Sequence, residues 1–181
     1  MSWLLDTDVI CQPAKRHGDP RVIAWLEREQ ERCYTSTVVI AQLAYWVRIK
    51  EGRQRQTLQA WTTRLVNALH GRNHGFNVST AMVWAEQERL LERSGQRMPV
   101  EDSYIAATAR RHGLTIVTGN DRDFRRPGIK VFNPFKDLVQ ANHSNTPETR
   151  KTVRKTVRKT RKTVRKTVSA RLSPFPTRRA R

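Results

Sequence analysis

The chain has 181 residues and a formal net charge of +19, since 35 Lys and Arg face 16 Asp and Glu. About two thirds of that charge lies in residues 141–181, which hold 14 Lys and Arg and a single acid, Glu148. Two cysteines are too few for a disulfide framework, and no apolar run is long enough for a membrane span or a signal-peptide core. We therefore expect a cytoplasmic protein with one domain over residues 1–140, a disordered basic tail over 141–181 and a polyanionic partner.

The first half of the chain alternates strand and helix patterns. A short apolar run that ends at Asp6 predicts a buried strand, and a helix follows with Asp19 as its N-cap. "CYTST" predicts a second strand. Residues 37–52 predict a helix that is capped by Thr37 and is apolar on nearly every side, so we expect it to be buried. A more amphipathic helix is expected over residues 54–70.

The second half continues the alternation. "FNVS" predicts a short strand, and Ser79 is expected to cap the helix that comes after it. "PVEDSYIAATARRHG" predicts a helix that stops at Gly113. "LTIVTGN" is the clearest buried strand, and "IKVFNPF" predicts a last short one. Strands that alternate with helices indicate an α/β fold with a mainly parallel sheet.

Acids fall at the places where such a sheet binds its ligands, beyond the carboxyl ends of the strands. Asp6 ends the first strand, and the turn "TGNDRDF" carries Asp121 and Asp123. Asp102 shares an apolar helix face with Ile105. Each acid alone fits a turn or a helix-dipole role, but together they would repel one another unless a cation or proton lies among them. Mg²⁺ and Mn²⁺ take such oxygen ligands and can activate a water for attack on a phosphodiester.

Four segments carry a resemblance to a known family: "LLDTDVI", "AQLAYWV", "VEDSYIAATARRHGLTIVTGNDRDF" and "GIKVFNPF". In order and spacing they resemble the PIN domain of VapC/FitB-type toxins over residues 2–138. The resemblance implies a three-layer α/β/α sandwich and a Mg²⁺- or Mn²⁺-dependent ribonuclease of a toxin–antitoxin system. It also implies a homodimer that a small VapB-like antitoxin neutralises, with operator DNA contacted only through that antitoxin.

The resemblance also assigns roles to individual residues. Asp6 and Asp102 match the two principal metal-binding acids, and Asp123 matches the later acidic position. Asn120 stands beside them as a polar neighbour of the metal site. Thr118 is expected to orient the cluster or the attacking water.

Gln42 departs from the family pattern, because "AQL" stands where the family has a Glu in a segment like "AEL". An amide oxygen can still hold a metal or a water, but one negative charge and any general-base role are missing. Asp121 is either a compensating ligand or a solvent-facing turn residue, and we favour the second. Two functions stay open: an active nuclease, or a weakened or inactive PIN protein that serves as an antitoxin-binding partner. In the second case Gln42 could be a purely structural core amide.

Cations near the acids are candidate contacts for the RNA substrate, although each alone is also an ordinary surface charge. The candidates are Arg48, Arg122 and Arg125, with Lys50, Arg53 and Arg126 as neighbours. The tail repeat "RKTVRKTVRKTRKTVRKTV" would bind nucleic acid without sequence preference, and we assign it no dedicated function. If nucleic-acid binding through this tail were the whole function, removal of residues 141–181 would abolish it.

Overall fold

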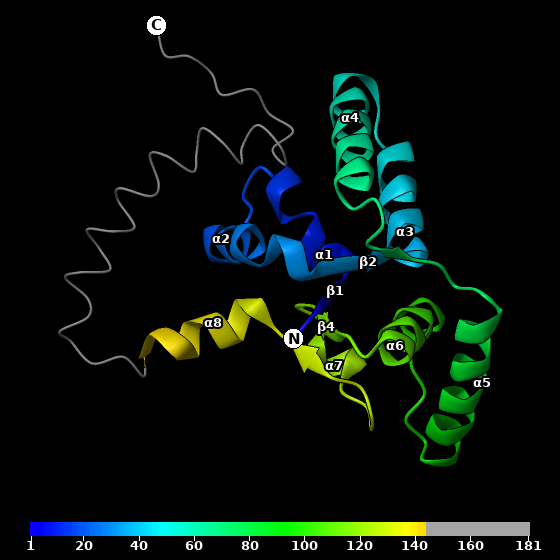
Figure 1. Cartoon of the computed structure of the whole chain (residues 1–181). Helices are drawn as coiled ribbons and strands as arrows, with labels where there is room; N and C mark the ends of the chain where they lie inside the picture. Colours follow the sequence, from blue (N-terminus) through cyan, green and yellow to red (C-terminus); the bar gives the residue numbers. More distant parts are fainter. Residues whose placement is uncertain (144–181) are drawn as a thin grey trace, which may run out of the picture.

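The structure, a computed structural model, describes residues 1–143 and the side chains of residues 1–138 (Figure 1). The basic repeat lies outside the described residues, and the predicted domain boundary at 140 falls within the last helix. In chain order the elements are β1 (Trp3–Leu5), α1 (Thr7–Ile10), η1 (Gln12–Ala14), α2 (Pro20–Glu29), η2 (Gln30–Arg32), β2 (Cys33–Ser36), α3 (Thr37–Arg48), α4 (Gly52–Ala68), β3 (Asn73–His74), α5 (Val78–Arg93), α6 (Val100–His112), β4 (Thr115–Val117), α7 (Asp121–Phe124), β5 (Val131–Phe132) and α8 (Pro134–His143).

The five strands form one parallel sheet in the order β3-β2-β1-β4-β5. The chain builds outward from β1 to β3 and then returns to the other side of β1 with β4. Parallel sheets with this order bind ligands where the direction reverses, in the crevice at the carboxyl ends of the strands. Here that crevice lies between the ends of β1 and β4, so the expected α/β fold places its acids at the predicted edge.

Helices cover both faces of the sheet, as Figure 1 shows. On one side α2 and α8 pack together, and Trp3 of β1 stacks edge-on against Trp25 of α2 with ring centroids 5.4 Å apart. On the other side α3 contacts α6, while α4 packs on α3 and α5 on α6. The core between these layers is apolar and contains fully buried Leu4, Ile105 and Ile116. The burial of such side chains is the main favourable contribution to folding.

Two helix ends are those that the sequence predicts. Asp19 caps α2, because its carboxylate accepts a hydrogen bond of 2.9 Å from the backbone N–H of Arg21. Gly113 ends α6 in a left-handed conformation, with φ of 66°, which only glycine adopts without strain. These two ends fix where α2 begins and where the chain leaves α6 for β4.

Three predictions about local structure were wrong. Ser36, not Thr37, caps α3, because its hydroxyl accepts from Val39 N–H. "FNVS" is not a strand: β3 lies three residues earlier, and Asn77 caps α5 through Thr80 N–H. The helix α3 is not buried on all sides, since the exposed fraction of Tyr45 is 67%. One face of this largely apolar helix is therefore exposed.

Candidate functional site

The ends of β1 and β4 meet at a buried pair of side chains, Asp6 and Thr118. The two strands are joined by the backbone N–H of Asp6, which donates to Val117 O over 3.0 Å. The Thr118 hydroxyl donates to Asp6 Oδ2 over 2.8 Å, and Thr7 N–H donates to Asp6 Oδ1 over 2.6 Å. Burial raises the pKa of Asp6, while these two hydrogen bonds oppose the rise. The Thr118 hydroxyl thus fixes one oxygen of the Asp6 carboxylate, and its role in a reaction stays a prediction.

Asp8 belongs to the same edge, and the sequence analysis gave it no role. Its Oδ2 accepts from Gly119 N–H over 2.8 Å, which ties α1 to the turn after β4. Its Oδ1 is buried and has no hydrogen-bond partner within the part of the chain that the structure describes. Burial, followed by the charge of Asp6, raises the pKa of Asp8 to about 6. The spacing of two acids directly after a strand was the signal that could have identified it.

Asp102 and Asp123 approach this edge from two helices, α6 and α7. Burial, and then the charges of Asp6, Asp123, Glu101 and Asp8, raise the pKa of Asp102 to about 6. Asp123 is held by Asn120, whose Nδ2 donates to Asp123 Oδ2 over 2.6 Å. The backbone N–H of Asn120 in turn donates to the Thr118 hydroxyl over 3.0 Å. The three expected acids therefore share one electrostatic environment, and Asn120 and Thr118 connect two of them.

Gln42 lies at the rim of this group with both ends of its amide engaged. Its Oε1 accepts a close hydrogen bond from the Thr7 hydroxyl, and its Nε2 donates to Glu101 Oε2 over 2.6 Å. The side chain is half-buried, so Gln42 is not an amide sealed in the core. Glu101, the residue before Asp102, is a second site neighbour that the sequence analysis missed. Its contact with Gln42 joins positions 59 residues apart, which no local pattern reveals.

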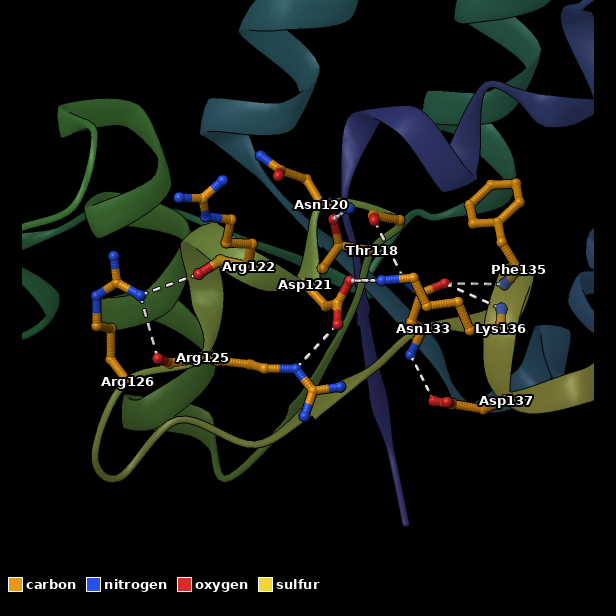
Figure 2. Close-up of polar contacts among 11 residues, drawn as sticks. Thr118, Asn120, Asp121, Arg122, Arg125, Arg126, Asn133, Phe135, Lys136 and Asp137 are labelled. Atoms are coloured by element: carbon orange, nitrogen blue, oxygen red, sulfur yellow. Dashed lines mark hydrogen bonds and ion pairs between the residues drawn. The ribbon is translucent and has the colours of Figure 1, made fainter. Parts of the chain in front are cut away.

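Asp121 corrects a prediction, because it does not face solvent and instead lies among Asn133, Lys136 and Arg125 (Figure 2). Only 7% of the residue is exposed. Its Oδ1 accepts from Asn133 Nδ2 over 2.9 Å and from Lys136 Nζ over 2.8 Å, and its Oδ2 accepts from Arg125 Nε over 2.9 Å. These donors hold the pKa of Asp121 well below its usual range. Asp121 fastens α7 to the start of α8 and cannot compensate for Gln42.

The basic candidates differ in what they contact. Arg125 pairs with Asp121, and Arg126 donates to the backbone oxygens of Arg122 and Arg125 (Figure 2). Arg126 also donates to Gln96 O over 2.8 Å. Arg48 and Arg122 are exposed. Among the described side chains, no ion pair joins a Lys or Arg to any of five acids, which we call the acidic cluster: Asp6, Asp8, Glu101, Asp102 and Asp123. Lys15 is a neighbouring cation, since its Nζ lies 3.5 Å from the backbone O of Asp8 and its charge lowers the pKa of that acid, but burial and Asp6 outweigh it.

The donors of the acidic cluster are suited to a hard divalent cation, since all of them are oxygens. A cation would give the unpartnered Oδ1 of Asp8 a partner and would offset the repulsion between Asp102 and its acidic neighbours. Among the described residues, no three His, Cys, Asp or Glu side chains lie close enough to enclose a metal by themselves. Mg²⁺ does not need such an enclosure, because it keeps several waters and binds through one or two carboxylates. The residues present therefore fit a hydrated, hard divalent cation.

A separate apolar cavity of about 490 Å³ lies between α2 and α4. Its lining includes Leu26, Cys33, Trp61, Leu65 and Leu69, and it contains no member of the acidic cluster. The chemistry expected from the sequence belongs to the sheet edge and not to this cavity. Within residues 1–143, no helix is both long and apolar enough to cross a membrane.

Comparison with known proteins identifies the protein family. The PIN domain family matches residues 3–130, so the chain belongs to the PIN-domain family. PIN-domain nucleases generally use divalent metal ions. Within the family, the chain is similar to Toxin FitB of Neisseria gonorrhoeae, with 32% identity over 137 residues, which cover 74% of this chain and 99% of FitB. It is also similar to VapC ribonuclease Y4jK of Sinorhizobium fredii, with 29% identity over 74% of this chain and 97% of the relative.

Solved structures agree with this assignment. A crystal structure of FitAcB from Neisseria gonorrhoeae has a TM-score of 0.70 and 31% identity, over 74% of this chain and 99% of that chain. A structure of FitAB bound to an IR36 DNA fragment has a TM-score of 0.69 and 29% identity, over 74% and 95%. The expected PIN-like fold and the VapC/FitB type of toxin are thereby confirmed.

Proposed function

We propose that the protein is a metal-dependent endoribonuclease toxin of a VapBC-like toxin–antitoxin system. The observation that carries the proposal is the convergence of the acidic cluster on the crevice between β1 and β4, in a chain that belongs to the PIN-domain family. The relative named as a VapC ribonuclease supports nuclease activity. RNA is the proposed substrate.

The roles follow from the positions of the side chains. Asp6, Asp102 and Asp123 would hold a hydrated Mg²⁺ or Mn²⁺ ion, with one or two of these carboxylates as direct ligands. When bound, that cation makes a water more acidic and stabilises charge on the phosphoryl oxygens. Thr118 keeps the Asp6 carboxylate in place, and Asn120 does the same for Asp123. Exposed Arg48 and Arg122 are proposed to attract the phosphates of the RNA, whereas Arg125 is already committed to Asp121.

The partners of the protein are proposed from its relatives. Similar proteins have been solved as FitAB and VapBC assemblies, some of them with DNA. We infer a small VapB-like antitoxin as the partner, with operator DNA contacted through it. We also infer a homodimer and a cytoplasmic location.

One observation favours a second candidate function, a catalytically weakened or inactive PIN protein that serves as an antitoxin-binding partner. Gln42 stands where the family resemblance leads us to expect an acid, and its neutral amide makes one hydrogen bond at each end. An active toxin would cleave RNA, whereas the antitoxin-binding partner would cleave it weakly or not at all.

The experiment is RNA cleavage by the purified antitoxin-free chain in Mg²⁺ or Mn²⁺, with and without chelator. The nuclease function predicts cleavage that needs the cation and is lost in Asp6→Asn. If the wild type does not cut and Gln42→Glu does, the second function is correct. Cleavage that persists in chelator would contradict the metal-dependent proposal.

A further inference from the structure

A hydrogen-bonded bridge crosses the rim of the acidic cluster and links three helices. The Thr7 hydroxyl of α1 donates to Gln42 Oε1 of α3, and Gln42 Nε2 donates to Glu101 Oε2 of α6. The amide orientation is set by its neighbours, since a hydroxyl donor lies on one side and a carboxylate acceptor on the other. A charge-assisted bond of 2.6 Å from the amide to Glu101 holds that carboxylate at the rim.

Glu101 has no competing cation in the described part of the chain. No Lys or Arg among the described side chains forms an ion pair with it, although its side chain is exposed. It stands beside Asp102 in the first turn of α6, where the helix dipole favours negative charge. Its side chain accepts from Gln42, and Gln42 in turn contacts Thr7, which lies between Asp6 and Asp8 in the chain.

We infer that Glu101 supplies the negative charge that position 42 lacks, and that Gln42 is the positioning residue that holds Glu101 for cation binding. This inference rests on the proposed function and deepens it. The rim of this chain then carries its carboxylate on α6, at Glu101, beside an amide on α3, at Gln42. Gln42 then marks a rearranged site and not a silenced one.

The pair allows a reciprocal exchange. In Gln42→Glu/Glu101→Gln, the new amide at 101 can donate to the new carboxylate at 42, and the Thr7 hydroxyl can still donate to that carboxylate. The bridge keeps its hydrogen bonds and its single charge, while the carboxylate moves from α6 to α3. Glu101→Gln alone removes the charge. Gln42→Glu alone places two carboxylates in contact, which is unfavourable unless a cation or a proton lies between them.

The test is Mn²⁺ binding to the full chain. The electron paramagnetic resonance signal of free Mn²⁺ reports how much of the ion is bound, and RNA cleavage is measured on the same samples. We expect Glu101→Gln to weaken Mn²⁺ binding by about tenfold, as loss of a supporting group at a metal site does. We expect the double variant to return to within about threefold of the wild type. Glu31→Gln, an exposed acid on η2, is the matched control for a general loss of charge and should bind as the wild type does. Circular dichroism establishes that each variant is folded.

Two results would overturn the inference: wild-type affinity in Glu101→Gln, or a double variant as weak as Glu101→Gln. The failure of the proposed function is distinguishable from either. If Mn²⁺ affinity follows the predicted order and no variant cuts RNA, the role of Glu101 stands and the nuclease proposal falls. If the wild type binds no Mn²⁺ at all, both are overturned.

Discussion

Asp121 and Asp123 lie two residues apart on α7, and the structure gives them opposite effects on stability. Asp121→Asn should lower the free energy of unfolding at pH 7, because the Asp121 carboxylate accepts from Asn133, Lys136 and Arg125. Its two cationic partners have side chains 62% and 64% exposed, so each pair contributes at most about 1 kcal/mol. The buried bond from Asn133 to a charged acceptor contributes about 1.5–3 kcal/mol, part of which an amide retains.

A total loss of about 2 kcal/mol corresponds to a fall in Tm of about 6 °C for a domain of this size. Thermal unfolding followed by circular dichroism, in chelator, measures it. Asp123→Asn is the matched control, because it removes a charge from the acidic cluster and should leave Tm unchanged or raise it. Because the folded-state pKa of Asp121 is lowered, its stabilisation is present above the ordinary value of 3.8 and is lost as pH falls below that value. An unchanged Tm in Asp121→Asn, or an equal fall in Asp123→Asn, would refute this account.

Two further predictions concern the acidic cluster and the turn after β4. Because the pKa of Asp102 is raised to about 6, its charge destabilises the cation-free fold fully above pH 6 and not below about pH 4. From pH 7 to pH 4, the free energy of unfolding of the wild type should therefore rise by about 1 kcal/mol relative to that of Asp102→Asn, a value discounted for partial exposure. If the free energies of unfolding of the two proteins changed in parallel with pH, this would be contradicted. Gly119→Ala should destabilise by about 1–3 kcal/mol, since its Cβ would lie 2.7 Å from Asp8 Oδ2 and 2.9 Å from the Phe135 ring. Gly75→Ala, with nothing within 4 Å of the added Cβ, is the control, and equal urea midpoints for the two variants would refute the close approach.

The alternation of strands and helices and the edge that carries the acids could be anticipated from the sequence, because both follow from local patterns. The strand order β3-β2-β1-β4-β5 was not predicted. The apolar run before Asp6 and the stripe that includes Asp102 are local patterns, and parallel sheets bring strand ends together. Asp123 was assigned by family resemblance, and no local pattern distinguishes it from Asp121. What separates them is Lys136, 15 positions later on α8, which reaches Asp121 only in the fold.

The hydrogen-bond partners of Gln42 were also not predictable, because they too are distant in sequence. Its neighbours Thr7 and Glu101 are 35 and 59 positions away, and each supplies a contact to one end of the amide. Composition marked Gln42 as an exception in an apolar helix, but only the packing of α1, α3 and α6 shows what the amide holds. The missed Asp8 is a different case, because its place after β1 was visible in the sequence.

The central claim is that the acidic cluster, and not the neighbouring carboxylate of Asp121, is the metal-dependent site of RNA cleavage. The most direct measurement is cleavage of a labelled RNA in Mn²⁺ by wild type, Asp102→Asn and Asp121→Asn, at a temperature where all three are folded. The account predicts cleavage by wild type and by Asp121→Asn, and none by Asp102→Asn. Cleavage that survives in Asp102→Asn and disappears in Asp121→Asn would contradict it.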